Sequence, residues 1–353
     1  MLRKIKILLT ATGAPGCSTL IRKLKNNGER DVEIVATDVS NEVIGAFWVD
    51  KFYTVPLSES SEFIPALKAI IEKEKPDVFF PVSSAEVLPV ARNKALFESL
   101  NTKIMVSDAS AIEVAINKYD LYSLLKKNDI PVPEFYSPRN LDEFTSMVKD
   151  LGYPNRKVCF KPHIGKGSRG FRILDDSISR KDLLLKYKPD SRYMSLREFT
   201  EIFEKEAEFP DLILMEVVEG AEYDAMTLCL RGDALLTTVK TREQSRWGII
   251  TLGELVDRPE IVDLVSRIIS MVPLSYNISL QFIQNKLIEI NPRTSTFIYQ
   301  NDLNEPYIAL KLCLGEIGKE EVRAYRSRIR YGRRMLRYMD QIFWDKGDNE
   351  CED

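Results

Sequence analysis

The chain has 353 residues but only one histidine, His163. Mechanisms in which a histidine activates a serine or cysteine nucleophile, or in which several histidines hold a metal, therefore have almost no material to work with. A metal ion bound by this chain would depend on oxygen ligands, which are the ligands that magnesium prefers.

Cysteine is also scarce and scattered. No two cysteines form a Cys-x-x-Cys pair, so the sequence supports neither a zinc site nor a disulfide framework. We expect structural roles for all of them: Cys17, Cys159, Cys229, Cys313 and Cys351.

Long apolar runs and an excess of one charge are absent as well. No stretch approaches the roughly 18 to 20 apolar residues of a membrane helix, and the start MLRKIKILL leads directly into a strand-like segment. Lys and Arg total 50 against 53 Asp and Glu, a formal net charge of -3. The sequence predicts a cytoplasmic protein with neither a membrane nor a nucleic acid as partner.

The first third of the chain alternates strand-like and helical patterns. Short apolar runs at 3–9, 32–37, 77–82 and 103–107 are separated by helical patterns such as 18–27 and 62–74. Alternation of this kind predicts a parallel sheet with helices packed on it. The length predicts two or three packed units in the whole chain.

The later pattern is different. A helix from Asn117 should end at Asn128-Asp129, because Pro131 and Pro133 cannot continue it. Strands at 157–162 and 170–174 bracket a glycine-rich turn, and a charged helical segment occupies 177–212. Three further runs, LILMEVVEG, YDAMTLCLRGDALLTTVKT and ISLQFIQNKLIEINP, indicate strands of an antiparallel sheet, followed by a helical, basic tail from Asp302.

Two glycine-bearing loops are candidates for binding phosphate. The first, ATGAPGCST, follows the opening strand but lacks the P-loop lysine and the full Gly-x-Gly-x-x-Gly pattern, so Gly13 and Gly16 are better explained by the turn itself. The second, FKPHIGKGSRGF at 160–171, combines three glycines with Lys161, Lys166 and Arg169. Its alternatives are a phosphate cradle and a flexible hairpin with a solvated basic face.

The segment LMEVVEGAEYD, residues 214–224, ends an apolar strand at a turn. Its backbone could meet an adenine edge and Glu222 could hold ribose hydroxyls. The alternative is that Glu216 and Glu222 are ordinary surface carboxylates.

Residues 280–295, LQFIQNKLIEINPRTS, carry the most specific pattern. Two strands joined by a tight turn at Asn285-Lys286 would place Gln281 beside Glu289 and Asn291, which alternate to one face. Oxygen donors gathered in this way predict a magnesium site, with Arg293 able to reach the same phosphates. The alternative is a set of polar residues on the open face of a sheet.

Five segments, taken in their order along the chain, resemble the ATP-grasp superfamily. They are NKYDLYSLLKKNDIPVP, KPHIGKGSRG, MEVVEGAEYD, QF…EINPR and NEPYIALKLCLGE. Within that superfamily, the resemblance is to the branch similar to the synthetase units of the carbamoyl-phosphate synthase large subunit. The resemblance extends over nearly the whole chain.

The resemblance implies a role for each matching residue. Lys118 and Lys161 would touch ATP phosphates, Glu216 with the backbone of Val217 and Val218 would receive adenine, and Glu222 would hold the ribose. Gln281, Glu289 and Asn291 would hold the metal, and Arg293 would face the transferred phosphate. The residues implied in the phosphate loop are Gly165, Lys166, Gly167 and Ser168, and those implied at the acyl phosphate are Lys240, Arg242 and Arg246. The alternative for this last set is a solvated charged strand.

The resemblance also implies the fold class and its division. A mixed α/β and α+β chain is expected, with an N-terminal parallel-sheet (Rossmann-like) pre-ATP-grasp domain at 1–112 and an ATP-grasp fold at 113–345 that grips ATP between antiparallel sheets. The latter divides into 113–218, which includes the small lid subdomain, and a metal-binding subdomain at 219–345. Residues 346–353 form a tail.

The implied activity is that of a ligase. ATP and Mg²⁺, with Mn²⁺ as an alternative ion, would activate a small-molecule carboxylate to an acyl phosphate that an amine attacks. Two alternatives stay open: a carbamoyl-phosphate-synthase-like subunit acting on bicarbonate or carbamate with partner subunits, and a nucleotide-binding regulator without turnover. A homodimer is one option for the oligomeric state.

Some features depart from the family pattern. TSTF follows EINPR where many relatives have a small or glycine-rich turn, and Trp247 stands where relatives often have glycine. Both departures lie on the expected substrate side. His163 lies inside the phosphate loop as either a ligand or an incidental residue, and the charged insert at 177–212 either covers the site or only decorates it.

Overall fold

The computed structural model describes residues 2–165, 169–188, 192–246, 248–295, 300 and 302–345. Its contacts divide the chain into two compact units. The first contains Met1–Ala115, Glu222–Gln281 and Ile290–Asp353, and the second contains Ile116–Ala221 and Phe282–Glu289.

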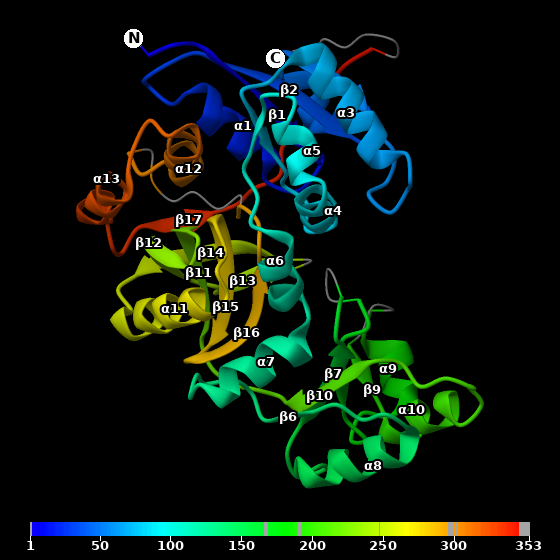
Figure 1. The fold of residues 1–353 in the computed structure, drawn as a ribbon. Helices are drawn as coiled ribbons and strands as arrows, with labels where there is room; N and C mark the ends of the chain where they lie inside the picture. The colour runs from blue at the N-terminus through cyan, green and yellow to red at the C-terminus, as the bar shows by residue number, and fades with distance from the viewer. Residues whose placement is uncertain are drawn as a thin grey trace. The chain divides into compact units, whose positions relative to one another are not determined.

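The N-terminal part of the first unit is a parallel sheet with strand order β3-β2-β1-β4-β5. Figure 1 labels β1 and β2 of this sheet. Its strands are β1 (Ile5–Thr10), β2 (Val32–Asp38), β3 (Lys51–Thr54), β4 (Val78–Phe80) and β5 (Lys103–Ile104). The intervening helices are α1 (Cys17–Lys25), α2 (Ile44–Trp48), α3 (Phe63–Glu74), α4 (Val87–Arg92) and α5 (Lys94–Glu98), and α6 (Ala109–Ile116) follows β5. The expected parallel sheet is therefore confirmed.

Periodicity explains how α1 docks on this sheet. Cys17, Leu20, Ile21 and Leu24 are buried, and their spacing places them on one face of the helix. The sheet strands supply the opposite surface, because β1 is almost entirely buried along its length. One apolar core therefore joins α1, β1, β2 and the later helix α12 (Glu305–Leu314).

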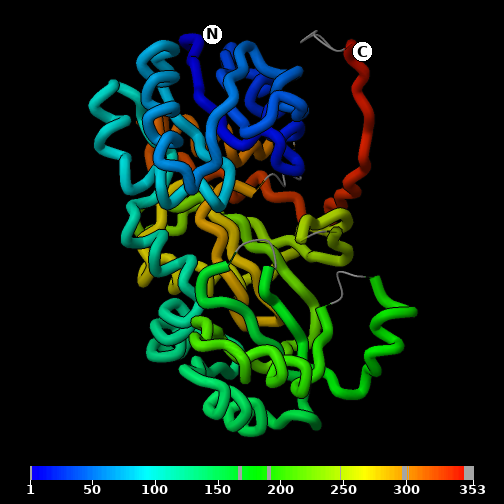
Figure 2. The backbone as a smooth tube through the Cα atoms, turned by 90° about the vertical axis from the view of Figure 1, so that its right-hand side faces the viewer, coloured from blue at the N-terminus to red at the C-terminus, as the bar shows by residue number. Residues whose placement is uncertain are grey.

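Helix α12 brings the C-terminal part of the chain against the N-terminal sheet. It packs beside α1, so the orange and blue segments lie together in both views (Figures 1 and 2). Its first turn is capped by the Asn304 side chain, which accepts from the Tyr307 N–H, and it ends at Gly315, whose φ of 78° suits a residue without Cβ. These caps fix where the helix starts and stops.

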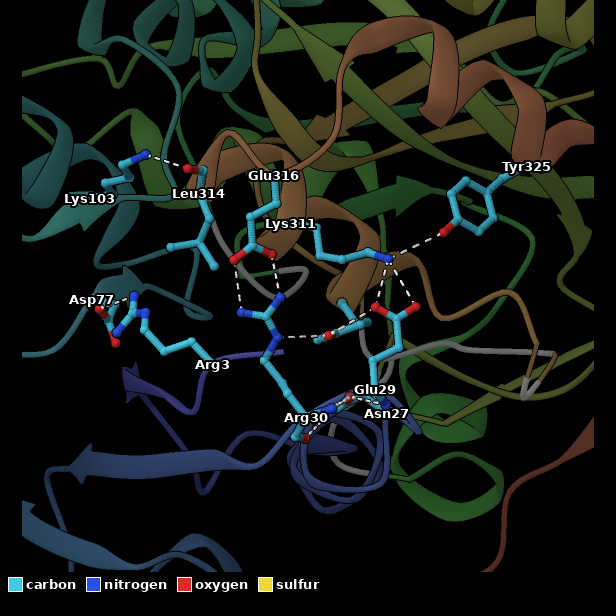
Figure 3. Close-up of polar contacts among 11 residues, drawn as sticks. Arg3, Asn27, Glu29, Arg30, Asp77, Lys103, Lys311, Leu314, Glu316 and Tyr325 are labelled. Atoms are coloured by element: carbon cyan, nitrogen blue, oxygen red, sulfur yellow. Dashed lines mark hydrogen bonds and ion pairs between the residues drawn. The ribbon is translucent and has the colours of Figure 1, made fainter. Parts of the chain in front are cut away.

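A polar network reinforces the docking of α12. The fully buried Arg30 guanidinium donates to Glu316 at 2.8 and 2.5 Å and to the Tyr307 hydroxyl at 3.1 Å. Lys311 donates to Glu29 at 2.9 Å. Figure 3 shows Arg30 and Lys311 each facing a carboxylate. The bidentate pair therefore neutralises a charge that would otherwise be costly to bury.

Replacing Arg30 by methionine is expected to lower the free energy of unfolding by about 3 kcal/mol, because Glu316 and Tyr307 lose their buried partner. Urea unfolding monitored by fluorescence measures the change. The control is Arg3→Met, which breaks an exposed pair with Asp77 and should cost less than about 1 kcal/mol. Equal small losses in both variants would show that the network does not stabilise the fold.

The other sheet of the first unit contains antiparallel strand pairs. Its strand order is β13-β14-β12-β11-β15-β16, and β17 pairs with β14. Its strands are β11 (Glu222–Leu230), β12 (Asp233–Thr241), β13 (Gln244–Arg246), β14 (Ile249–Val256), β15 (Tyr276–Ile283), β16 (Lys286–Asn291) and β17 (Arg334–Leu336). Residues 282–289 of β15 and β16 are grouped with the second unit. The accompanying helices are α11 (Pro259–Met271) and α13 (Lys319–Ala324), which runs into a 3-10 turn at Tyr325–Arg328.

The second unit is built on a sheet with order β6-β10-β7-β8-β9. Its strands are β6 (Phe135–Tyr136), β7 (Val158–Pro162), β8 (Arg172–Leu174), β9 (Tyr193–Met194) and β10 (Leu212–Glu216). Its helices are α7 (Lys118–Lys127), α8 (Leu141–Asp150), α9 (Arg180–Lys186) and α10 (Leu196–Phe203). The apolar core between α8, α10 and the sheet centres on Phe144, Phe160 and Phe199.

Several details differ from the sequence expectations. The run LILMEVVEG forms β10 of the second unit's sheet, whereas we expected it in one sheet with the two later runs. The turn before β16 lies at Gln284-Asn285, one residue earlier than predicted, because Gln284 adopts a φ of 51°. The basic tail is not helical throughout, since its residues Arg334–Leu336 pair with β14. Within the described ranges, no helix has the length and apolar character needed to cross a membrane.

Candidate functional site

Two buried lysines of the second unit define the candidate site. Lys118 is 7% exposed and starts α7, and Lys161 is 9% exposed on β7. Their ammonium groups contact main-chain carbonyls at 3.4 Å, Lys118 that of Gly165 and Lys161 that of Ile288. Because both ammonium groups are buried and these hydrogen bonds are long, each group can still donate to a bound anion.

The electrostatics of the two lysines agree with that reading. Burial lowers the pKa of Lys118, against the opposing effect of the nearby Glu289 carboxylate. Burial likewise lowers the pKa of Lys161 to about 8, with Glu289 opposing and Lys118 adding to the shift. The charges of the two ammonium groups and of Glu289 therefore interact with one another inside the second unit.

Neighbouring residues fix the positions of both lysines. The Lys118 N–H donates to the His163 carbonyl at 3.0 Å, which ties α7 to the end of β7. The Tyr122 ring lies 5.8 Å from the Lys161 ammonium, and its hydroxyl donates to the Ile288 carbonyl at 2.6 Å. Tyr122 was not predicted from the sequence, although it lies one helical turn after Lys118 and therefore on the same face of α7.

The predicted metal ligands lie on neighbouring strands. Glu289 and Asn291 are two residues apart on β16 and so share a face of that strand, and Gln281 lies on the adjacent β15. All three are partly exposed, while Phe282 and Ile290 beside them are buried. Convergence of the three oxygen donors on one ion stays a prediction.

Glu216 has a different environment from the one expected. Its buried carboxylate pairs with Lys286 and with Arg156, the latter at 2.6 Å, and accepts the Glu134 N–H at 3.0 Å. Burial opposes ionisation, but these partners together hold the pKa of Glu216 below its usual range. The surface-carboxylate alternative is therefore wrong for Glu216.

Backbone groups around Glu216 are partly used by the sheet. The Val217 N–H donates to the Lys157 carbonyl at 3.0 Å, and Val218 is half-buried. An adenine contact at this segment would fall on main-chain groups, since the Glu216 carboxylate is already engaged. That contact stays a prediction.

An open pocket of about 630 Å³ also lies within the second unit. Glu216, Arg156 and Lys286 line one part of it, and the Ile130–Glu134 segment lines another. Its charged lining residues include equal numbers of acidic and basic groups, which gives it no clear preference for one charge.

In the first unit, the predicted acyl-phosphate residues have unequal settings. Arg242 donates to Glu222 at 3.2 Å, so the predicted ribose ligand is ion-paired. Arg246 is exposed on β13. Lys240 is completely buried on β12, so the solvated-strand alternative does not apply to it.

Arg293 contacts the loop that follows β4. Its Nε donates to the Ser84 hydroxyl at 2.8 Å and its Nη1 donates to the Thr294 carbonyl at 3.1 Å. These contacts lie within the first unit and give the guanidinium a defined orientation.

His163 has internal partners. Its Nε2 lies 3.0 Å from both the Ser137 hydroxyl and the Leu212 carbonyl, and its ring stacks on Tyr119 at 5.2 Å. The side chain therefore bridges β7, β10 and α7, a positional role that neither sequence alternative included. Lys166, Gly167, Ser168 and Trp247 lie outside the described residues.

The opening loop has its own internal explanation. The Gly13 N–H donates to the Asp38 carboxylate at 2.7 Å, and Gly16 has a φ of 88° immediately before α1. A Cβ on Gly13 would lie 2.7 Å from Val43 Cγ1. The glycines thus permit the turn and close packing, and a carboxylate already occupies the Gly13 amide.

Comparisons with known proteins agree with the fold. Residues 208–334 match the family model described as ATP-grasp in the biosynthetic pathway with Ter operon. The chain is 28% identical over 170 residues to the formate-dependent phosphoribosylglycinamide formyltransferase of Histophilus somni (strain 129Pt). The matched stretch covers 48% of this chain and 39% of that protein. It is 26% identical over 173 residues to the carbamoyl phosphate synthase large chain of Saccharolobus solfataricus, covering 48% of this chain and 16% of that protein. The matched stretches are therefore well under half of each relative.

A solved structure extends the likeness to most of the chain. The biotin carboxylase domain of Hydrogenobacter thermophilus 2-oxoglutarate carboxylase, in complex with MgADP, ADP and bicarbonate, superposes with a TM-score of 0.64 at 16% identity, covering 89% of this chain and 70% of that one. The fold class expected from the sequence is confirmed. The chain is therefore similar to ATP-grasp proteins, with the family-model match confined to residues 208–334.

Proposed function

We propose that this protein is an ATP- and Mg²⁺-dependent ligase that joins a small-molecule carboxylate to an amine through an acyl phosphate and releases ADP and phosphate. One observation carries the proposal: Lys118 and Lys161 are buried lysines whose ammonium groups make long contacts with main-chain carbonyls and interact with the charge of Glu289. Such a group of charges suits a triphosphate and its counterion better than it suits a solvated surface.

The residues fit what phosphoryl transfer requires. This reaction depends on positioning and charge neutralisation more than on a protein base, so a chain with one histidine is not at a disadvantage. Lys118 and Lys161 would hold the phosphates, with their positions set by the His163 carbonyl and Tyr122. Both contacts would restrict motion of the ammonium groups before the nucleotide binds.

The donor set on β15 and β16 suits Mg²⁺. One carboxylate and two amide oxygens, from Glu289, Gln281 and Asn291, leave further coordination positions for phosphate oxygens and water. When bound, the ion would offset the charge that develops on the transferred phosphoryl group.

The proposed chemistry has two bond exchanges. A substrate carboxylate oxygen attacks the γ-phosphorus of ATP, the bond to the β-phosphate oxygen breaks, and ADP leaves. The amine nitrogen then attacks the acyl carbon, phosphate leaves, and the nitrogen loses a proton. Arg293, Lys240, Arg242 and Arg246 are proposed to stabilise the acyl phosphate, as the family resemblance implies.

Nucleotide affinity should depend on pH through Lys161. Because burial lowers its pKa to about 8, the group is a cation below that pH and loses its charge as the pH rises through it. Calorimetric titration with Mg²⁺ and a non-hydrolysable ATP analogue is expected to show affinity falling between pH 7.5 and 9. Lys161→Arg should remove that fall because its cation persists; an unchanged pH profile would contradict the assignment.

A second candidate function has its own support. The similarity to a carbamoyl phosphate synthase large chain, and to a biotin carboxylase domain solved with bicarbonate, favours phosphorylation of bicarbonate or carbamate. This alternative predicts that ADP formation requires bicarbonate and not an organic acid.

A substrate panel distinguishes the two. Amino acids and small organic acids are assayed in pairs for phosphate release with Mg²⁺ and ATP, and mass spectrometry identifies the product. The ligase proposal expects one acid and one amine together to stimulate release, with ¹⁸O from the labelled acid appearing in phosphate. Stimulation by bicarbonate with ammonia alone would favour the second candidate, and no stimulation by any pair would count against both.

A further inference from the structure

A polar ladder runs between β11 and β12 in the first unit. Asp224 and Lys240 face each other in the antiparallel register. Residues opposite one another in such a pair point to the same face of the sheet. Along the same face, Arg242 pairs with Glu222 two residues further on. Two consecutive cation–carboxylate rungs therefore cross this strand pair.

The inner rung is withdrawn from water. Lys240 has no exposed surface and Asp224 is 3% exposed, whereas the Arg242–Glu222 rung reaches solvent. The Ser279 hydroxyl on the next strand, β15, donates to the Asp224 carboxylate. Gln281 lies two residues after Ser279 and so on the same face of β15. Lys240 thus lies on the face that carries a predicted metal ligand.

A second buried carboxylate, on a helix, interacts electrostatically with Lys240. Glu305 is the first residue of α12, is 4% exposed, and accepts the Thr238 hydroxyl at 2.7 Å. Thr238 precedes Lys240 by two residues on β12 and shares its face. Burial raises the pKa of Glu305, while the charge of Lys240 opposes that shift and Asp224 adds to it. Asp224, Lys240 and Glu305 therefore interact as one buried group.

Burying an ammonium group costs free energy unless charges and hydrogen bonds compensate. Apolar side chains of similar size would stabilise such a site as well or better. A buried charge at this place therefore indicates that the ammonium group of Lys240 has to be held at a defined position. The Thr238 and Ser279 hydroxyls fix both carboxylates in turn. The arrangement resembles the outer shell of a reactive centre, in which partners orient a working group.

We propose that Asp224 and Glu305 are positioning residues that fix the ammonium of Lys240 on the sheet face carrying Gln281. The role of Lys240 toward an acyl phosphate rests on the proposed function above, but the positioning itself does not. Asp224 faces Lys240 across the strand pair and Glu305 interacts with the charge of Lys240, so removal of either carboxylate should change the orientation and mobility of the cation.

Nuclear magnetic resonance of the full chain, labelled with ¹⁵N at lysine side chains, tests the positioning without turnover. The Lys240 ammonium signal is the one missing from Lys240→Arg. We expect this signal to shift or broaden in Asp224→Asn and in Glu305→Gln, and to stay unchanged in Glu320→Gln, whose side chain is exposed. A Lys240 signal unaltered by both test variants would overturn the proposal.

Kinetics of Mg²⁺-dependent ADP formation test the consequence for catalysis. Glu305→Gln is expected to lower kcat about 10-fold with KM for ATP within about twofold, because an outer partner is lost while ATP contacts remain. Lys240→Met combined with Glu305→Gln should be no slower than Lys240→Met alone. If the kcat losses of the two single variants multiplied in the double variant, Glu305 would act independently of Lys240. A wild-type chain that forms no ADP would refute the proposed function, whereas the resonance result would still decide the positioning.

Discussion

Replacing Glu289 by glutamine is expected to lower the rate of Mg²⁺-dependent ATP turnover by at least about 100-fold. Glutamine keeps the shape of the side chain but removes the carboxylate charge from the predicted ion and from the neighbourhood of Lys118 and Lys161. Because Glu289 is partly exposed on β16, the substitution should not disturb the core. Phosphate release under saturating ATP and varied Mg²⁺ measures the effect.

The matched control is Glu201→Gln on α10 in the second unit. Glu201 forms an exposed pair with Arg197, four residues earlier on the helix. Its loss should leave turnover within about twofold of the wild type, since exposed pairs contribute little. If Glu289→Gln retained wild-type turnover at every Mg²⁺ concentration, the metal assignment would be wrong.

Lys161→Met is expected to weaken binding of the Mg²⁺ complex of ATP by about 10- to 100-fold, the value of one or two charge-assisted hydrogen bonds. The same variant should unfold at an equal or higher temperature than the wild type, because methionine removes the cost of burying the ammonium. Calorimetric titration and thermal unfolding together separate a binding residue from a structural one.

Lys186→Met serves as the control for Lys161. Lys186 is an exposed residue of α9 in the same unit and forms a local pair with Asp182. Its replacement should change neither affinity nor stability appreciably. A loss of stability in Lys161→Met with undiminished nucleotide affinity would assign Lys161 to the core instead of the site.

Patterns of neighbouring residues predicted most of the fold. Buried β-branched runs at 32–37 and 77–82 and the helical pattern at 62–74 correspond to β2, β4 and α3, because each pattern arises from burial of one face or one strand. The short β3 at Lys51–Thr54 escaped prediction, since its residues are half-buried or exposed and have little periodicity. Membership of β10 in another sheet depends on pairing with β7 and β6, which distant contacts decide.

The motifs around Lys118 and Lys161 predicted both as phosphate ligands, and that role stays a prediction. The structure shows that both lysines are buried and that the charge of Glu289 acts on both. The partners of Glu216 could not be predicted, because Lys286 and Arg156 are far from it in the sequence. Glu305 was missed for the same reason: its contact with Thr238 exists only once α12 docks on the sheet.

The most direct test is a crystal structure of the full chain with Mg²⁺ and a non-hydrolysable ATP analogue. We predict a magnesium ion coordinated by Glu289 and nucleotide phosphate oxygens within hydrogen-bonding distance of the Lys118 and Lys161 ammonium groups. A nucleotide bound at the Gly13 loop beside β1, with no ion at Glu289, would contradict the central claim.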